Sequence, residues 1–380
     1  MKFILKKEQP KADALLVRLK QQRAKDKAEF EAVESWDLIR DGITQSMIAT
    51  FLTCKEKMNL SYIQRKRKIK NNTEAMDFGN VIHDVLAMIY NASKSLDRKI
   101  FEEHIEEIIE EATNEWYDIT YEGIGYNSYD IKKLERHHGL VKVLLPEYFQ
   151  FYADDFDELN FREVEEVFDI DLEVVIERQV FTFRLRGKID GVLEYFTDST
   201  DNESSIDLEL MEHKTKGKWD EEILQHKLPL DLQVNLYLWA VWRKYGIYPG
   251  AILYNMIRKP QLRQGKKETL KEYIRRVRAD IHDRPEFYFK RIRGEVNPKD
   301  IMDWEKNTLI PILADINVWW GSGTHYKNVT ACTSGYLPCP FIAYCGSNNN
   351  ALYDNKRRLF SELKVEAVPK IAEKWGKNRV

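Results

Sequence analysis

Apolar residues in the first part of the chain recur at helical spacing. Residues 76–95 show this most clearly, with apolar positions three and four apart. Residues 46–54 begin with a serine that can cap a helix. Residues 99–160 continue as helices, with one glycine- and tyrosine-rich interruption near 123–130. The first forty residues have the pattern of a charged helix, and nothing in their sequence assigns them a role.

After residue 160 the spacing changes to that of strands. Apolar and polar positions alternate, and a polar cluster between two strand-like runs can reverse the chain. The predicted elements are, in order, a strand over 164–176, two strands over 181–190 and 206–214 around a turn at 197–205, a helix over 229–244 and a strand over 251–257. This order predicts an α/β fold with a small central mixed sheet flanked by helices.

Composition is that of a globular chain long enough to bury a substantial core. Of 380 residues, 43% are hydrophobic and 32% are charged, and no apolar run is long enough to cross a membrane. The apolar stretch at the start is too short for a secretory signal, so we expect a cytoplasmic protein. In a reducing cytoplasm, the four cysteines are better explained by metal or cluster ligation than by disulfides.

The net charge of −3 hides two strongly biased segments. Residues 101–123 carry nine acidic residues and no lysine or arginine. Residues 258–299 carry fourteen lysines and arginines against six acidic residues. The basic segment can line a path for phosphates, or it can be a solvated helix face.

Two carboxylates and one amine stand at the ends of the two strands around the polar turn. Asp190, with a glycine directly after it, ends the first strand, and Glu212-His213-Lys214 ends the second. Carboxylate oxygens are hard ligands that suit Mg²⁺ or Mn²⁺ better than Zn²⁺. A lysine beside two carboxylates should stay protonated, which favours electrostatic stabilisation and water positioning over general-base chemistry for Lys214. An ordinary surface salt bridge on a hairpin is the alternative.

This hairpin resembles the core of the PD-(D/E)XK nucleases, and further motifs resemble their RecB-like branch. The match spans roughly residues 44–346, in the family's order. The residues that carry it are Asp190 with Glu212-x-Lys214, a helix with Gly79-x-x-x-His83, and a helix with Gln233-x-x-x-Tyr237.

The resemblance implies a role for each of these residues. Asp190, Glu212, His83 and the backbone carbonyl of His213 would hold a Mg²⁺ or Mn²⁺ ion. Lys214 would orient the attacking water and stabilise the phosphoryl transition state. Gln233 and Tyr237 would position the substrate, and Arg258 and Lys259 would contact the DNA backbone. Without the resemblance, His83 would be read as a hydrogen-bonded core residue, and Gln233 and Tyr237 as the edge of a packed helix.

The cysteines are arranged as one plus three. Cys54 stands 278 residues before Cys332, and Cys339 and Cys345 follow closely. This set resembles the 4Fe-4S staple of AddB-type and CRISPR-adaptation-type nucleases. Zinc is a less favoured alternative because no second short knuckle surrounds Cys54, and free buried thiols are another.

The sequence therefore predicts a metal-dependent DNA nuclease, in the first place an exonuclease on single-stranded or end-containing DNA. DNA is the expected partner and no membrane is expected, whereas the sequence does not decide whether a helicase or recombination protein works beside it. The resemblance, which includes many phage and prokaryotic proteins, also implies a prokaryotic or phage-infected cell. The alternative is a non-cleaving DNA-binding or recombination subunit that keeps the fold. The expected regions are a charged helical region (1–45), a first-cysteine helix (46–75), the nuclease core (76–257), a basic helical segment (258–330), a cysteine loop (331–346) and a tail (347–380).

Overall fold

The computed structural model divides into two compact units. The larger contains Gly42–Ile48 and Asn72–Ser322, and the smaller contains Ala49–Asn71 and Gly323–Ser361 together with the segment that ends at Asp41. Within these bounds the structure describes residues 37–68, 74–95, 98–124, 128–198, 204–333, 338–347 and 349–355. Most of the expected N-terminal helical region and of the C-terminal tail lies outside the described residues.

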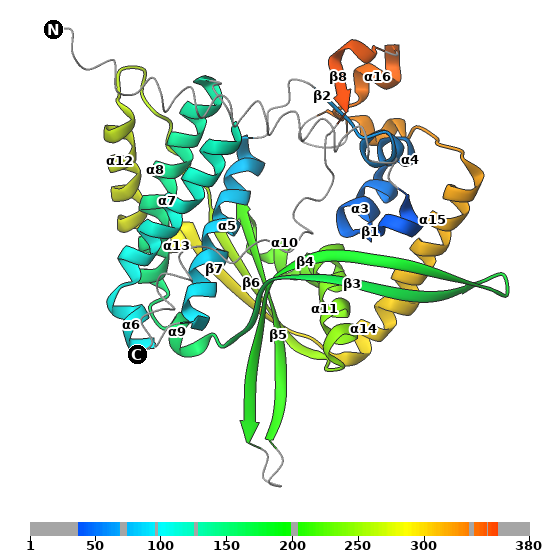
Figure 1. Ribbon diagram of the computed structural model, residues 1–380, viewed down its shortest axis with the longest axis horizontal. Coiled ribbons are helices and arrows are strands. Elements are labelled where there is room, and N and C mark those ends of the chain that lie inside the picture. Colours follow the sequence, from blue (N-terminus) through cyan, green and yellow to red (C-terminus); the bar gives the residue numbers. More distant parts are fainter. Residues whose placement is uncertain are drawn as a thin grey trace. The chain divides into compact units, whose positions relative to one another are not determined.

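A six-stranded mixed sheet forms the centre of the larger unit (Figure 1). Its order is β1-β4-β5-β6-β7, and β3 also pairs with β4. The pairs β3–β4, β4–β5 and β6–β7 are antiparallel, whereas β1–β4 and β5–β6 are parallel. The strands are β1 (Ile43–Thr44), β3 (Phe161–Ile176), β4 (Gln179–Asp198), β5 (Ser204–Lys216), β6 (Pro249–Arg258) and β7 (Phe289–Glu295).

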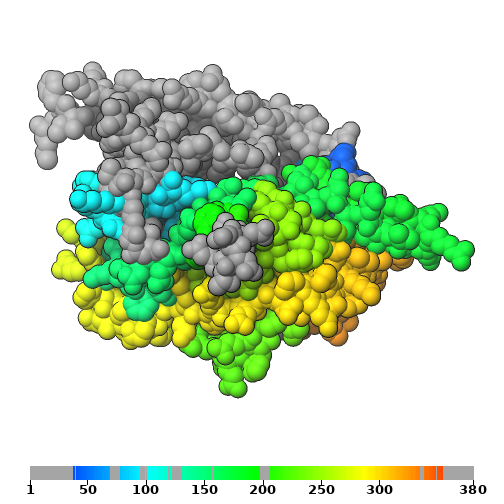
Figure 2. Space-filling view, turned by 90° about the horizontal axis from the view of Figure 1, so that it is seen from below, coloured from blue at the N-terminus to red at the C-terminus, as the bar shows by residue number. Residues whose placement is uncertain are grey.

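The β3–β4 hairpin is long and projects from the body of the larger unit (Figures 1 and 2). Ile176 pairs with Gln179, so only two residues make the turn. Both of these, Glu177 and Arg178, have positive φ angles of 50° and 70°. A two-residue turn with two left-handed residues matches the twist of the paired strands, which explains the tight reversal.

Helices flank this sheet (Figure 1). The helix α5 buries Phe78, Ile82, Val85 and Ile89 at helical spacing in a core that it shares with α7, α8 and α12. The helices of the larger unit are α5 (Glu74–Ser95), α6 (Arg98–Glu103), α7 (Ile105–Ile124), α8 (Ser128–Phe151), α9 (Asp155–Glu158), α10 (Glu221–Lys227), α11 (Leu232–Tyr245), α12 (Leu270–Asp283), α13 (Pro285–Tyr288), α14 (Pro298–Trp304) and α15 (Ile310–Ser322), with the short helical turns η2 (Leu228–Leu230) and η3 (Glu305–Leu309).

The smaller unit is built from short elements around one apolar cluster. Leu60, Phe341 and Tyr353 form this cluster, and β2 pairs with β8 in antiparallel fashion. Its elements are α2 (Leu38–Asp41), α4 (Lys55–Met58), η1 (Asn59–Ile63), β2 (Lys66–Lys68), η4 (Val329–Cys332), α16 (Ile342–Ser347), η5 (Asn350–Leu352) and β8 (Tyr353–Asn355). The helix α3 (Gln45–Thr53) begins in the larger unit and ends in the smaller.

The predicted fold class is confirmed: a central mixed sheet is flanked by helices. One element differs from the sequence prediction, because the basic segment 258–330 contains strand β7 as well as helices. Three basic residues in that strand, Lys290, Arg291 and Arg293, mask its alternation, and all three form ion pairs with carboxylates. Among the described residues, no helix is long and apolar enough to cross a membrane.

Candidate active site

The candidate site lies where strands β4 and β5 separate. Their pairing runs from Asp198↔Ser204 to Gly191↔Met211 and stops there. Asp190 and Glu212 are the next residues of the two strands, so they flank the gap that opens. Strand β5 continues to pair with β6 as far as Lys216↔Arg258, which holds the residues after Glu212 in place.

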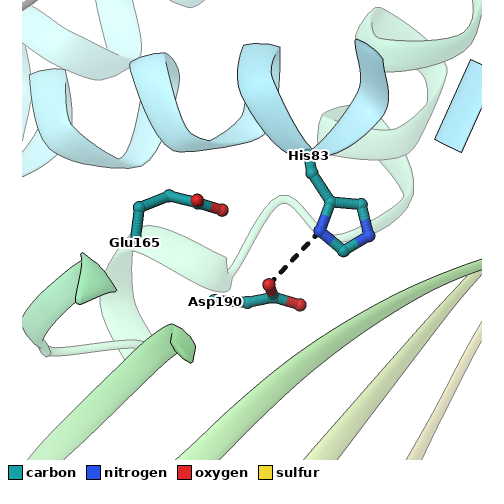
Figure 3. Close-up of side chains that lie close together, drawn as sticks. All are labelled: His83, Glu165 and Asp190. Carbon is teal, nitrogen blue, oxygen red and sulfur yellow. Dashed lines mark hydrogen bonds and ion pairs between the residues drawn. The ribbon is translucent and has the colours of Figure 1, made fainter. Parts of the chain in front are cut away.

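Asp190 is fixed by two hydrogen bonds from different elements. Its Oδ2 accepts a hydrogen bond of 2.7 Å from the backbone N–H of His213 on β5. Its Oδ1 lies 3.3 Å from Nδ1 of His83 on helix α5, as Figure 3 shows. Asp190 and His213 are both buried. These contacts orient the Asp190 carboxylate toward the helix that carries His83.

Glu165 is a third acidic residue at this position, and it was absent from the sequence prediction. Its carboxylate lies with His83 and Asp190 in a group whose ligand atoms are all within 4.8 Å of one another (Figure 3). The backbone of Glu165 has φ 55°, a left-handed value that is uncommon for residues other than glycine. Strained backbone of this kind is often found at functional sites. The other partner of Glu165 is the amine of Lys188.

Glu212, Lys214 and Gln233 form a closed polar cluster beside this group. Oε1 of Glu212 accepts hydrogen bonds from Nζ of Lys214 and, at 2.7 Å, from Nε2 of Gln233. Oε1 of Gln233 accepts from Nζ of Lys214 at 2.8 Å. The other oxygen of Glu212, Oε2, is buried and has no hydrogen-bond partner among the described residues.

Helix α11 places Gln233 at its first turn. The Asp231 side chain caps the helix by accepting hydrogen bonds from the backbone N–H groups of Gln233 and Val234, at 2.9 and 3.0 Å. Tyr237 follows one turn later and is buried, with its ring edge against Phe168. Gln233 therefore contacts the carboxylate cluster directly, and the buried Tyr237 is a hydrogen-bond partner of Gln233. Burial raises the pKa of Tyr237, and the nearby charges of Glu212 and Asp190 raise it further.

The three carboxylates have very different proton affinities. Burial raises the pKa of Glu212, and repulsion by Asp190 raises it further, to about 8. Burial and the same repulsion raise the pKa of Glu165 to about 7. Burial opposes ionisation of Asp190 too, but attraction to His83 and their hydrogen bond outweigh it and hold the pKa of Asp190 below its usual range. The carboxylates thus repel one another, and this repulsion raises the pKa values of Glu212 and Glu165.

The basic groups respond to the same field. Burial lowers the pKa of His83, but Asp190 overcomes this effect and raises it to about 9. Burial likewise opposes the charge of Lys214, yet Glu212 and Asp190 raise its pKa above the ordinary value. Lys214 is therefore a protonated amine held between a carboxylate and an amide.

The His213 ring is held by a buried network on the side of β5 opposite Lys214. Nδ1 of His213 accepts a hydrogen bond of 2.7 Å from Asn255, whose Oδ1 accepts one of 3.2 Å from Arg291. Arg291 also donates to both oxygens of Asp155 and, at 2.7 Å, to the hydroxyl of Tyr148. Because a guanidinium can only donate, it fixes the Asn255 amide, which in turn leaves the His213 proton on Nε2. Burial lowers the pKa of His213 to about 3, so this ring is neutral.

The pocket fits a divalent cation. Two carboxylates and an imidazole converge, the neighbouring Glu212 has a buried oxygen without a partner among the described residues, and two carboxylic acids have raised pKa values. A hard cation would relieve the repulsion and give the orphaned oxygen of Glu212 a partner. His83, Glu165, Asp190 and Glu212 are the side chains that would hold it.

Gly79 and the expected DNA-binding pair take different positions around this pocket. A Cβ at Gly79 would lie 3.8 Å from Cβ of Thr215, so α5 runs close to the strand residue after Lys214. The guanidinium of Arg258 donates to the carbonyls of Phe287 at 2.7 Å and Gly217 at 3.1 Å. Lys259 lies with its amine 5.3 Å from the centre of the Phe78 ring. Arg258 thus binds two backbone carbonyls of residues that are distant in the sequence. This structural role could not be predicted without knowing which residues lie near it in the fold.

The four cysteines all lie in the smaller unit and form no disulfide. The backbone N–H of Asn328 points to Sγ of Cys54 at 3.4 Å, and that of Cys339 donates to the carbonyl of Cys332 at 2.8 Å. Cys345 packs beside Cys339 on the apolar cluster of this unit. In the described part of the chain, the sulfur atoms do not form a group close enough to bind one metal ion. The four thiols therefore lie in one unit, but among the described residues they do not form a complete set of ligands for one metal ion.

This combination of a parted hairpin, clustered carboxylates and an adjacent lysine defines a divalent-metal site suited to phosphodiester hydrolysis. The chain belongs to the PD-(D/E)XK nuclease superfamily, whose profile matches residues 42–346. Nucleases of this superfamily use divalent metals, so family and geometry agree. No curated protein matches the chain.

Proposed function

We propose that this protein is a Mg²⁺- or Mn²⁺-dependent deoxyribonuclease that degrades DNA from ends or as single strands. The observation that supports this most directly is Glu212, whose Oε1 binds Lys214 and Gln233 while its Oε2 is buried without a partner. The unpartnered oxygen of Glu212 can bind a cation, and the amine of Lys214 beside it can face a phosphate.

The side chains of the site have different roles in hydrolysis. A bound divalent cation lowers the pKa of water and neutralises phosphate charge. Asp190, Glu212 and His83 would hold that cation with the carbonyl of His213, and Glu165 would add a further ligand. Lys214 stays protonated and stabilises the negative charge that develops on the phosphate oxygens.

Helix α11 supplies the groups that orient substrate and water. The Gln233 amide forms hydrogen bonds with both Lys214 and Glu212 and so holds the two side chains beside each other. It therefore positions the attacking water relative to the amine. Tyr237 supports the base of this cluster, and Lys259 contacts the DNA backbone at the rim.

The test uses end-labelled DNA with the purified full chain. The wild type should cleave with Mn²⁺ or Mg²⁺, and Lys214→Ala should lose cleavage by about a hundredfold or more while it still binds DNA. The matched control is Lys306→Ala, because Lys306 is an exposed lysine outside the site. Cleavage by Lys214→Ala at the wild-type rate would overturn the role of this lysine.

Linear strands labelled at the 5′ or the 3′ end, compared with circular single strands, test the exonuclease mode. Release of short products from linear strands alone supports end-dependent cleavage. A wild type that binds DNA but never cleaves it with either metal would instead support the non-cleaving recombination subunit. The three intact acidic residues and the lysine favour the nuclease.

We propose further that the four cysteines bind a 4Fe-4S cluster. All four lie in one unit, and Cys54, Cys339 and Cys345 are close enough to influence one another electrostatically. The thiolates of such a cluster bind different irons, so they sit farther apart than the four ligands of one zinc ion. Anaerobic purification followed by iron, sulfide and zinc analysis distinguishes the two. Stoichiometric zinc without sulfide would overturn the cluster.

A further inference from the structure

Aromatic and guanidinium groups alternate in a stack at the end of the two central parallel strands. The guanidinium carbon of Arg258 lies 3.9 Å from the ring centre of Trp219 and 4.1 Å from that of Phe287. The guanidinium carbon of Arg284 lies 4.2 Å from the Phe287 ring. Trp219 follows β5, Arg258 ends β6, and Arg284 and Phe287 belong to the start and body of α13. We call these four residues the terminal stack.

Hydrogen bonds hold the terminal stack rigid. Arg258 donates to the carbonyls of Phe287 and Gly217, at 2.7 and 3.1 Å. Arg284 donates to both carboxylate oxygens of Asp280, at 2.9 and 2.8 Å. Both guanidinium planes are therefore ordered before any ligand binds. A ligand that stacks on this surface does not have to order them, which lowers the entropic cost of binding.

Trp219 is the outer member of the stack and has an uncovered surface. It is half-buried and does not belong to the buried core. In the part of the chain that the structure describes, no other aromatic ring stacks on it, and its indole N–H makes no hydrogen bond. Its ring packs against the Arg258 guanidinium, and the part of the side chain that stays exposed can contact a planar ligand.

The charge around Trp219 favours a polyanion. Residues 214–219 and 258–267 together contain eight lysines and arginines and no acidic residue. The two segments are neighbours, because Lys216 pairs with Arg258 and its carbonyl accepts a hydrogen bond of 3.2 Å from the N–H of Lys259. The exposed Lys218 stands directly beside Trp219 in the sequence. An aromatic platform in a basic channel is the arrangement that binds single-stranded nucleic acids.

The terminal stack is also continuous with the candidate active site. Glu212, Lys214 and Lys216 alternate along one face of β5, and Trp219 follows Lys216 by three residues. A strand whose phosphate lies at Lys214 and that follows β5 reaches Trp219 within a few nucleotides. Bases inside a duplex are already stacked on their neighbours and cannot use the ring.

We propose that Trp219 stacks with one unpaired base of a DNA strand a few nucleotides from the scissile phosphate, and that the terminal stack sets a preference for single-stranded or frayed ends. This inference rests on the proposed nuclease function, and it adds a subsite that distinguishes single-stranded from duplex DNA. Lys218 and Lys259 neutralise the phosphates on either side of that base.

The first test measures binding of the full chain to a short single strand in EDTA, where cleavage does not occur. Trp219→Leu should weaken binding by about tenfold, and Trp219→Phe should stay within about threefold of the wild type, because it keeps a stacking ring. Binding of the blunt duplex of the same sequence should not change. Trp320→Leu is the matched control, since Trp320 is a half-buried tryptophan on α15, outside the stack.

The second test varies the DNA and measures the wild type first, with Trp219→Leu as the comparison. Single abasic positions are moved along the strand, and binding to the wild type is measured for each. Stacking predicts that one position loses about as much affinity as Trp219→Leu, and that the variant is insensitive to the base at that position. Equal sensitivity at all positions, or an equal loss on duplex and single strand, would overturn the subsite. In either case cleavage by the wild type stays intact, so failure of the subsite is distinguishable from failure of the nuclease proposal.

Discussion

The backbone N–H of His213 donates a hydrogen bond of 2.7 Å to Oδ2 of Asp190 across the gap between β5 and β4. It ties the two strands together one residue beyond the point where their regular pairing ends. The contact leaves the carbonyl of His213 free for the metal role that the family resemblance implies. The position of this peptide therefore determines the geometry of the whole pocket, and the groups that hold His213 matter for metal binding.

Asn255→Leu should destabilise the protein and weaken Mn²⁺ binding. The change removes the partner of His213 Nδ1 and of Arg291 Nε in a fully buried position. Loss of these bonds should lower the free energy of unfolding by about 1–3 kcal/mol. Urea denaturation measures the first effect and Mn²⁺ titration followed by electron paramagnetic resonance the second. An unchanged Mn²⁺ affinity in a destabilised protein would show that the network is only structural.

Glu165→Gln should lower Mn²⁺ affinity by about tenfold or more without unfolding the protein. The amide keeps the shape of the side chain but removes one negative charge from the group with His83 and Asp190. The matched control is Glu163→Gln, two residues earlier, because Glu163 pairs with Lys94 and not with the metal group. Equal affinities for wild type and Glu165→Gln would exclude Glu165 as a ligand.

The metal-free protein should lose stability as pH rises from about 5 to about 9. Three groups of the pocket have raised pKa values: His83 at about 9 instead of 6.5, and Glu212 at about 8 and Glu165 at about 7 instead of 4.5. The folded state thus holds protons that the unfolded chain releases earlier. The stability they contribute is complete below the unfolded pKa values and is lost as pH rises through the folded ones.

A divalent cation must displace the same protons. Its stabilising effect should therefore grow over the same pH interval. Thermal unfolding with EDTA and with Mn²⁺, at several pH values, measures both trends. Glu212→Gln removes one titrating group and should flatten the metal-free profile. A melting temperature that rises with pH in EDTA would contradict the assignment.

Cys339→Ser should lose the proposed cluster and destabilise the smaller unit. The exchange keeps the size of the side chain but removes a soft ligand, and Cys339 also packs against the apolar cluster of that unit. Ligand binding of this kind contributes directly to folding free energy, on the order of several kcal/mol. Iron content and thermal unfolding report the change, with Ser347→Ala as a control on the exposed end of α16. Wild-type iron content in Cys339→Ser would exclude Cys339 as a ligand.

The strands of the sheet could be predicted from the sequence because β3 to β5 contain alternating apolar and polar stretches and β6 is a short apolar run that is buried on both faces. The strands on either side of the predicted turn and most of the helix over 229–244 could be read from local pattern, whereas residues 199–203 of the turn lie outside the described residues. The motif residues Asp190 and Lys214 could be named from the motif that they share with the family. The predicted strand end at Asp190 was wrong, because β4 continues to Asp198 and pairs with β5 beyond this residue. The structure places them together with His83, Glu212 and Gln233.

The remaining site residues depend on contacts between distant segments. Glu165 stands in a run of acidic residues, and only its left-handed backbone and the strand opposite it direct its side chain to Asp190. Asn255 looks like an ordinary polar interruption of an apolar strand until its bond to His213 is known. Arg258 was expected to meet phosphate, whereas its guanidinium is bonded to two backbone carbonyls.

The projecting β3–β4 hairpin has a practical consequence. Its tip, Glu177 and Arg178, is exposed, and Val175 and Val180 beside it are largely exposed as well. A two-residue reversal that needs only left-handed backbone can be replaced by Asn-Gly or opened to accept a short peptide tag. This loop is therefore the place to attach a fluorophore or surface tether, so that single molecules can be watched on DNA.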